Sequence, residues 1–214
     1  MNLPDSASVA IPDATGKLHA PSAARNGDAL LHTIAKYVPA SGNALEIASG
    51  TGEHIIRYAR AFPNVTWQPT DIDQDRLDSI KAWSVEADLP NINPPKFLDA
   101  SVAGWAADCI GQDLIMLSNL LHLISEAEAL VVVTQSAAAL NSGGVSLIYG
   151  PFLRGSNFAS VGDREFHESL NQQDAEIGYK SYQVIQDMQK KCGLIVLEPI
   201  EMPANNLVLV AHEK

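Results

Sequence analysis

The sequence predicts an α/β protein built on a doubly wound, mostly parallel sheet of seven strands whose last strand is antiparallel. Up to about residue 150, short apolar runs alternate with segments of helical periodicity, an order that gives parallel strands joined by right-handed helical crossovers. The apolar run 45–47 ends in a glycine-rich turn, SGTG, and then becomes helix-like. The last two apolar runs are joined by a stretch too short for a crossover, so we expect them to pair antiparallel.

The predicted strands are short apolar runs bounded by turn residues such as Gly, Pro, Asn and Asp. The two runs after residue 190 form the antiparallel pair, and the five before them form the parallel part. They comprise residues 44–48, 65–69, 97–98, 113–117, 145–149, 194–198 and 207–211.

The predicted helices have apolar residues three and four positions apart. We expect the first helix to begin at Asn26 and to stop at Pro39. Ser125 and Glu128 form a capping box at the start of a helix that runs to Leu140. The other predicted helices contain residues 55–59, 77–83 and 181–193, and a short helical segment follows Asp163.

The length of 214 residues suits one domain. Residues 1–20 are rich in Pro, Ser, Ala and Asp without clear periodicity, and we interpret them as a flexible N-terminal arm or lid, with a simple tail as the alternative. Residues 21–214 then form the single domain, and an irregular polar insertion at about 152–180 would cover the substrate.

Composition argues against several classes of partner. Acidic residues outnumber basic ones by 25 to 14, and the resulting charge of −11 should repel nucleic acid. No apolar run approaches the roughly 20 residues that span a bilayer, so we expect a cytoplasmic protein without a membrane partner. Cys109 and Cys192 lie far apart without flanking histidines, which favours two reduced thiols over a metal site.

The glycine-rich turn predicts a cofactor site, because glycines let backbone N–H groups approach a ligand closely. A dinucleotide fingerprint needs a third glycine, but the sequence has Ile55 there, or Glu53 if the frame starts at Ala48. A carboxylate would repel a pyrophosphate, whereas Glu46 would favour a ligand that carries an ammonium and a sulfonium. We therefore expect S-adenosylmethionine at this turn, held around Ala48, Ser49, Gly50 and Gly52.

Two further acidic residues stand at predicted strand ends. Asp71 follows the second strand and is expected to accept hydrogen bonds from the ribose hydroxyls, as the corresponding acid does in dinucleotide sites. Asp99 and Ala100 follow the third strand beside the expected adenine amino group, and Ile72 can lie against the adenine face. The alternatives are a helix N-cap for Asp71 and a turn aspartate for Asp99.

The order EIASGTG, PTD, FLDAS and DLIMLSNLLH resembles the motif series of class I S-adenosylmethionine-dependent methyltransferases, which have a Rossmann-like fold. PSAARN, EIASGTGEH, WQPTD, YGPF and EMPANN are similar to a methyltransferase-like family described as a domain of unknown function, and the resemblance runs from about residue 20 to the end. The sequence departs from that pattern at Ala24, where Glu is usual, and at Asp163 and His167, where Asn and Asp are usual. The resemblance implies the fold and the cofactor but hardly constrains the acceptor.

Other polar residues are candidates for the methionine part of the cofactor. Arg25 and Asn26, expected just before the first helix, could close over its carboxylate, with an N-cap role as the alternative for Asn26. Ser118 and Asn119, at the end of the fourth strand, could also contact it. No carboxylate stands at that strand end, so we predict no metal.

Two residues are candidates for catalysis. His122 could serve as a base, although a histidine satisfied within its loop explains it equally well. Tyr149 ends the fifth strand and could orient an acceptor, with a buried structural tyrosine as the alternative. The NPPK stretch at 93–96 precedes the third strand, not the fourth, so we interpret it as a loop and not as an amino-group methylation motif.

These observations favour a metal-independent methyltransferase with a small-molecule acceptor. Two alternatives stay open: a module that binds S-adenosylmethionine without catalysis, and an NAD(P)-dependent oxidoreductase, which the missing third glycine disfavours. A protein acceptor is a weaker variant, because no sequence feature marks a peptide groove. A homodimer is compatible with the sequence.

Overall fold

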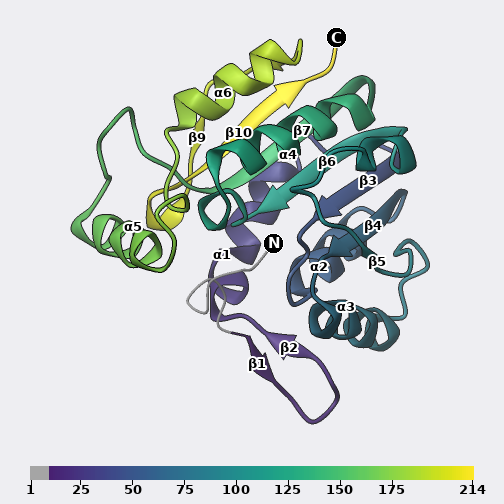
Figure 1. Ribbon diagram of the computed structural model, residues 1–214. Coiled ribbons are helices and arrows are strands. Elements are labelled where there is room, and N and C mark those ends of the chain that lie inside the picture. Colours follow the sequence, from purple (N-terminus) through teal and green to yellow (C-terminus); the bar gives the residue numbers. More distant parts are fainter. Residues whose placement is uncertain (1–9) are drawn as a thin grey trace.

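The computed structural model describes residues 10–214 and confirms the α/β class (Figure 1). Its large sheet has the strand order β5-β4-β3-β6-β7-β10-β8, with β9 also paired to β10. All pairings from β5 to β7 are parallel, and those of β10 are antiparallel. The strands are β3 (Gly42–Ile47), β4 (Val65–Asp71), β5 (Lys96–Phe97), β6 (Gln112–Ser118), β7 (Leu140–Pro151), β8 (Ile195–Val196), β9 (Ile200–Glu201) and β10 (Asn206–His212).

The sheet has eight strands where the sequence predicts seven. The predicted strand 194–198 is only Ile195–Val196, and a second short strand, Ile200–Glu201, pairs with the other end of β10. Pro199 lies between them and has no N–H to donate to β10, so pairing is interrupted at this position. The predicted antiparallel pairing of the last two runs is confirmed by the partners Val196 and Ala211.

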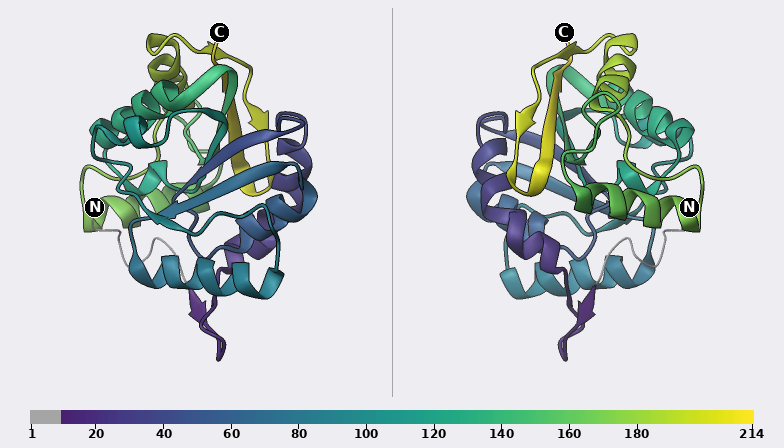
Figure 2. Two further views of the ribbon diagram at one scale, coloured as in Figure 1. Left: turned by 90° about the vertical axis from the view of Figure 1, so that its right-hand side faces the viewer. Right: turned by 90° about the vertical axis from the view of Figure 1, so that its left-hand side faces the viewer.

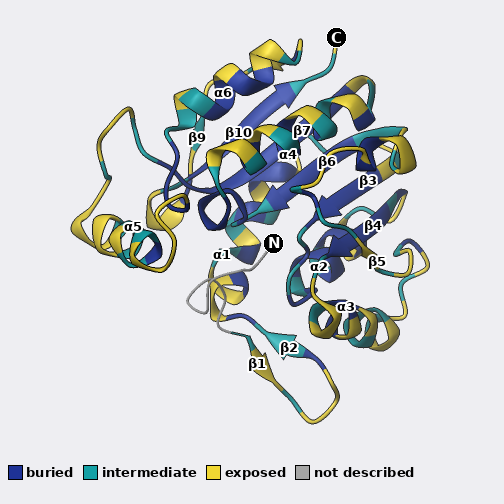
Figure 3. Ribbon diagram, viewed as in Figure 1, coloured by how far each residue is buried: buried dark blue, intermediate teal, exposed yellow. Residues whose placement is uncertain are grey.

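Helices cover both faces of the sheet (Figure 2). On one face α1 (Pro21–Ile34), α2 (Glu53–Ala61) and α3 (Gln74–Ala87) pack against the strands around Trp67, and on the other α4 (Glu126–Ala139) and α6 (Tyr182–Lys191) pack around Ile115. Figure 3 shows the strands as the most buried part of the molecule and the outer helix faces as exposed. Burial of both sheet faces explains why the parallel strands are continuous apolar runs.

The first helix starts earlier than the sequence pattern indicates. It begins at Pro21, not at Asn26, with Ala20 in extended conformation as its N-cap. Proline suits the first helical position because its fixed φ is helical and its missing N–H needs no partner there. Consequently Arg25 and Asn26 lie within the helix instead of before it, and Asn26 is not an N-cap.

The capping box of α4 is confirmed. The Oγ of Ser125 accepts a hydrogen bond from the N–H of Glu128 at 3.2 Å, and Oε2 of Glu128 accepts one from the N–H of Ser125 at 2.7 Å. These two bonds satisfy donors that the start of a helix otherwise leaves free. They fix the start of α4, the next α-helix after β6, whose end lies at the candidate site.

Residues 1–9 of the predicted arm lie outside the described residues. The rest of the arm has a defined conformation, because β1 (Ile11–Pro12) and β2 (Leu18–His19) form a small hairpin that projects from the body of the molecule (Figures 1 and 2). Its base is attached to α3: the N–H of Leu18 donates to Ser79 Oγ at 2.8 Å, and Trp83 Nε1 donates to the Leu18 carbonyl at 3.1 Å. The hairpin therefore leads the chain into α1 along a fixed path.

The polar insertion at 152–180 contains α5 (Val161–Gln173), which lies at one end of the sheet (Figure 1). Asp163 caps this helix together with Ser160 and also accepts a hydrogen bond from Asn205 Nδ2 at 3.0 Å. This last contact connects the insertion to the turn before β10. No helix among residues 10–214 is both long and apolar enough to cross a membrane.

Candidate functional site

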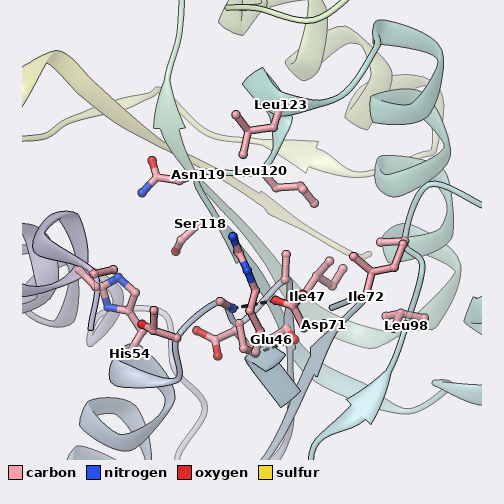
Figure 4. A pocket seen from close by; sticks show the side chains of 18 of the residues that line it. Glu46, Ile47, His54, Asp71, Ile72, Leu98, Ser118, Asn119, Leu120 and Leu123 are labelled. Carbon is pink, nitrogen blue, oxygen red and sulfur yellow. Dashed lines mark hydrogen bonds between the residues drawn. The ribbon is translucent and has the colours of Figure 1, made fainter. Parts of the chain in front are cut away.

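A cavity lies at the carboxyl ends of β3, β4 and β6, where the strand order reverses direction in sequence (Figure 4). In open α/β sheets ligands bind at this switch point. The space between its walls, including open solvent at the mouth, is about 880 Å³. We call it the first cavity. It is lined by Ala20, Ser22, Ala23, Glu46, Ile47, Ala48, Ser49, Gly50, Thr51, His54, Asp71, Ile72, Arg76, Leu98, Ala100, Ser118, Asn119, Leu120 and Leu123.

Most residues expected at the cofactor converge on this cavity. Nine of the thirteen predicted cofactor residues line it, from the ends of β3, β4, β5 and β6 and the loops that follow them. They are Glu46, Ala48, Ser49, Gly50, Asp71, Ile72, Ala100, Ser118 and Asn119. Gly52, Asp99, Arg25 and Asn26 are not among its lining residues.

The glycine-rich turn has an unusual backbone. Ala48, Gly50 and Gly52 all have positive φ, of 53°, 61° and 95°. A left-handed conformation costs a residue with a Cβ about 1–2 kcal/mol, so Ala48 carries strain that the two glycines avoid. Gly52 caps α2 and faces the protein interior: a Cβ there would lie 3.0 Å from Cα of Ile80 on α3. Gly52 thus permits close packing of the turn against α3 and does not contact the first cavity.

Asp71 is held at the cavity wall by two backbone donors. Its Oδ2 accepts a hydrogen bond from Gly50 N at 2.9 Å, and its Oδ1 accepts one from Asp73 N at 3.1 Å. Figure 4 shows the position of Asp71 in the cavity wall. The residue is 2% exposed, and burial raises the pKa of its carboxyl group. Each carboxylate oxygen retains a further lone pair for a ligand hydroxyl. The N-cap alternative is excluded, because Asp73 caps α3.

Glu46 is the second carboxyl group in the cavity wall. It is 2% exposed, and its Oε2 has no hydrogen-bond partner among residues 10–214. Burial, with a smaller repulsion from Asp71, raises the pKa of Glu46 to about 8. A buried carboxyl oxygen without a partner is costly, so this geometry favours a ligand that brings a hydrogen-bond donor or a positive charge.

Asp99 is a turn aspartate, which is the alternative to an adenine contact given above for this residue. Its Oδ1 accepts hydrogen bonds from the N–H and Oγ of Ser101, at 3.0 and 2.6 Å, which makes a side-chain turn. Its neighbours Leu98 and Ala100 line the first cavity in its place. One oxygen of the carboxylate is therefore bonded within the loop, and the two residues next to Asp99 supply apolar wall where we expected a polar group.

Glu53 also differs from the expectation that it borders the ligand. Its Oε2 accepts hydrogen bonds from Ala20 N at 2.7 Å and from Thr51 Oγ1 at 3.0 Å. The side chain thus joins the start of α2 to the residue that precedes α1. Because it is turned away from the first cavity, Glu46 and Asp71 remain as the carboxyl groups that line it.

The start of α1 is a part of the site that the sequence reasoning missed. Ser22 and Ala23 line the first cavity, and neither a side-chain cap nor an acidic residue occupies the first turn of this helix. The first-turn N–H groups have no partner within a helix and carry partial positive charge, which attracts anions. Pro21, a typical first helical residue, was the sequence signal for this position.

His54, Arg76 and several apolar residues were missed as well. His54 stacks on Tyr58 with ring centroids 5.8 Å apart, and burial lowers the pKa of His54 to about 4. Its imidazole is therefore neutral at pH 7. Its position in the first turn after the glycine loop, like that of Arg76 after Asp71, was the available signal. The apolar residues are Ile47, Leu98, Leu120 and Leu123.

A second cavity adjoins the first, and Ser22 and Asn119 line both. It holds the two predicted catalytic residues, His122 and Tyr149, together with Arg25 and Asn26, which we expected at the methionine carboxylate. The insertion and the turn before β10 complete its wall. It is lined by Pro21, Ser22, Arg25, Asn26, Asn119, His122, Tyr149, Pro151, Phe166, Tyr179, Pro203, Ala204 and Asn206.

Tyr149 lies in β7 with its side chain at the second cavity. Its hydroxyl accepts a hydrogen bond from Asn206 Nδ2 at 3.0 Å. Burial raises the pKa of Tyr149, and hydrogen bonds with Asn26 and Asn206 offset part of that effect, so the hydroxyl is neutral at pH 7. Because the amide of Asn206 donates to it, the hydroxyl is an acceptor in that bond and keeps its own proton as a donor.

His122 is 6% exposed and lies among aromatic rings of the insertion. The ring centroids of Phe166 and Tyr179 are 5.8 and 6.1 Å from that of His122, both in edge-to-face geometry. Burial, with a smaller repulsion from Lys180, lowers the pKa of His122 to about 3. Such an imidazole is a weak base at neutral pH. Lys180 is itself buried and donates to the carbonyls of Ile124 and Gly178, so it does not present its charge to a ligand.

Within residues 10–214, no group of three or more His, Cys, Asp or Glu side chains lies close enough together to hold a metal ion. Cys109 and Cys192 are not joined by a disulfide.

Three solved methyltransferase structures share this fold at low sequence identity. An O-methyltransferase family protein from Burkholderia thailandensis matches with a TM-score of 0.75 and 17% identity, over 88% of this chain and 56% of its own. An O-methyltransferase family 2 protein from Planctomyces limnophilus, in complex with apigenin, matches with a TM-score of 0.72 and 16% identity. The match covers 88% of this chain and 62% of that protein. Human N-acetylserotonin methyltransferase, in complex with SAM, matches with a TM-score of 0.67 and 13% identity. The match covers 90% of this chain and 52% of that protein.

The present chain therefore spans little more than half the length of these three proteins. At this identity the match establishes a shared fold, which agrees with the strand order and the antiparallel β10 described above. A family model gives a closer relation. The model described as "Protein of unknown function (DUF938)" matches residues 17–213, nearly the whole chain, and the protein belongs to this family.

Proposed function

We propose that this protein is an S-adenosylmethionine-dependent methyltransferase that acts on a small molecule without a metal ion. One observation carries the proposal: two buried carboxyl groups, Glu46 and Asp71, line a cavity beside a glycine turn whose amide at Gly50 is already bonded to Asp71. Carboxyl groups in this position disfavour a pyrophosphate and suit a ligand with hydroxyl and ammonium groups.

The residues of the first cavity fit the parts of this cofactor. Asp71 would accept hydrogen bonds from the ribose hydroxyls, and Ile72 and Leu98 supply apolar surface for the adenine ring. The partnerless Oε2 of Glu46 would take the ammonium group. The uncapped start of α1, with Ser22 and Ala23, offers its N–H groups to the carboxylate.

This assignment gives Arg25 and Asn26 a different role from the one expected from sequence. Both line the second cavity, so we assign them to the acceptor and assign the methionine carboxylate to the start of α1. The second cavity is the proposed acceptor site. It meets the first cavity at Ser22 and Asn119, and there the acceptor atom would face the cofactor.

When bound, the cofactor supplies an electrophilic methyl group. The contribution of this chain is to hold the acceptor in line with that group, and such alignment accounts for a large part of the rate in displacement reactions. Tyr149, fixed by Asn206, would donate a hydrogen bond to the acceptor. His122 is a neutral, weak base in an aromatic environment, so we assign it to acceptor positioning and not to proton removal.

The similar structures support the same assignment. The human protein binds SAM and the Planctomyces protein binds apigenin, a small molecule, on the same fold. The carboxyl groups and the two adjoining cavities of this chain are the independent reason to extend a methyltransferase function to it.

Calorimetric titration tests the cofactor directly. We expect S-adenosylhomocysteine to bind and NADH not to bind, and a preference for NADH would contradict the proposal in favour of an oxidoreductase. A panel of phenols, thiols, amines and carboxylates, assayed for release of S-adenosylhomocysteine, then tests transfer. Cofactor binding without turnover across the whole panel would instead support a non-catalytic binding module.

A further inference from the structure

We infer that the acceptor is an aromatic molecule that carries an anionic group such as a carboxylate, and that Arg25 binds this group. The inference rests on the proposed function, because it takes the second cavity as the acceptor site. It goes further in naming the chemical class of the acceptor and the residue that selects it.

The charge of the second cavity is the first argument. Its lining residues include one arginine and no Asp or Glu among the described residues, although acidic residues exceed basic ones by 25 to 14 in the whole sequence. Arg25 forms no ion pair within residues 10–214, whereas Arg57 and Arg154 are paired with Asp28 and Glu201. A positive side chain without a partner at a cavity with no carboxylate favours an anionic ligand.

The shape and chemistry of the walls are the second argument. Phe166 and Tyr179 contact each other edge to face, with centroids 6.1 Å apart and planes at 73°, and both contact His122 in the same way. Pro151 and Pro203 add apolar wall without N–H donors. Aromatic rings favour these edge and face contacts with one another, so a planar aromatic ligand matches this wall.

The position of Arg25 on α1 is the third argument. Arg25 follows Ser22 by three residues, so the two side chains lie on the same face of the helix. At 1.5 Å per residue the two positions are roughly 5 Å apart along the helix axis. Ser22 marks the junction with the first cavity, where the methyl group is transferred. An acceptor with its reactive group at the junction can therefore place an anionic group across one ring near Arg25.

Three phenols of equal ring size test the inference: 4-hydroxybenzoate, 4-hydroxybenzamide and tyramine, which are anionic, neutral and cationic at pH 7. Each is titrated into the protein preloaded with S-adenosylhomocysteine. We expect 4-hydroxybenzoate to bind at least tenfold more tightly than the other two. Arg25→Gln should abolish this preference. The matched control Arg60→Gln, which removes an exposed arginine of α2, should retain it.

Three results would overturn the inference while leaving the proposed function intact. One is binding of S-adenosylhomocysteine with no binding of any of the three phenols. The second is equal affinity for the benzoate and the benzamide. The third is an Arg25→Gln protein that loses affinity for S-adenosylhomocysteine but not for 5′-methylthioadenosine, because Arg25 would then serve the methionine carboxylate. If S-adenosylhomocysteine fails to bind the unmodified protein, the proposed function itself is wrong.

Discussion

Gly50 N donates a hydrogen bond to Oδ2 of Asp71 at 2.9 Å, which joins the turn after β3 to the end of the neighbouring strand β4. The bond makes one rigid edge from two segments that are far apart in sequence. Because Asp71 also accepts from Asp73 N, its carboxylate is oriented before any ligand arrives. Preorganised polar groups of this kind lower the cost of binding.

Asp71→Ala should therefore remove cofactor binding. It deletes the proposed ribose contact and leaves the N–H groups of Gly50 and Asp73 without their acceptor. Both hydrogen bonds are only partly buried, so water can replace the acceptor and the loss of stability should stay below the roughly 1–3 kcal/mol of a fully buried donor. Calorimetry with S-adenosylhomocysteine and urea unfolding measure the two effects separately. Asp99→Ala is the matched control, since Asp99 does not line the first cavity, and it should retain affinity. Equal affinities in the two variants would contradict the role of Asp71.

Glu46 should make stability depend on pH in the opposite direction to most acidic residues. Burial raises its pKa from 4.5 to about 8, so between these values the folded protein holds a proton that the unfolded chain has lost. The stability that Glu46 contributes is complete below pH 4.5 and is lost as the pH rises through 8. Glu46→Gln keeps the neutral form at every pH, so its stability relative to the wild type should increase over that interval, on the order of a few kcal/mol.

Urea unfolding of both proteins at pH 5, 6, 7 and 8 measures this difference. Glu176→Gln, which changes an exposed carboxylate, is the control and should follow the wild-type pH dependence. If the Glu46→Gln and wild-type curves run parallel, then the Glu46 carboxyl group is not protonated in the folded protein at neutral pH.

Gly52→Ala should destabilise the fold more than the same substitution at Gly104, another glycine with positive φ. Both Gly52 and Gly104 have positive φ, so alanine at either costs about 1–2 kcal/mol of backbone strain. At Gly52 the new Cβ would also lie 3.0 Å from Cα of Ile80, whereas at Gly104 nothing lies within 4 Å. Overpacking adds roughly 1–3 kcal/mol. Urea unfolding of the two variants gives the loss in free energy of unfolding for each, and the difference between them measures the clash at Gly52. Equal losses would contradict the packing role of Gly52.

Tyr149→Phe should separate cofactor binding from turnover. The hydroxyl faces the second cavity and is bonded to Asn206, so its removal should leave affinity for S-adenosylhomocysteine unchanged. Once an acceptor has been found, turnover should fall roughly tenfold or more, because the acceptor loses an aligning donor. Tyr37→Phe, outside both cavities, should change neither quantity. Retained turnover in Tyr149→Phe would show that the tyrosine is structural.

The sequence predicted the parts of the site that follow directly from chain order. Glu46, Asp71 and Ser118 stand at the ends of apolar runs, and parallel strands bring such ends to one edge of the sheet. The glycine turn was visible for the same reason, since positive φ and close approach need glycine. These features depend on the local sequence pattern and on the handedness of crossovers, and both can be predicted from the sequence alone.

The remaining parts of the site depend on side-chain direction, which sequence does not specify. Asp99 is adjacent to two lining residues, yet its Oδ1 bonds Ser101 and Asp99 itself does not line the first cavity. Arg25 was assigned to the cofactor because α1 was expected to start at Asn26, and a start at Pro21 moves it to the second cavity. The eighth strand was missed because Pro199 divides the edge partner of β10 into two pieces.

Ser22 and Asn119 belong to the walls of both cavities, so the proposed cofactor and acceptor sites share two polar side chains at their boundary. A single bisubstrate compound, an adenosyl group linked by a short chain to an anionic ring, can therefore extend through that boundary. Under the proposed function, such a compound would occupy both cavities at once and bind more tightly than either of its parts.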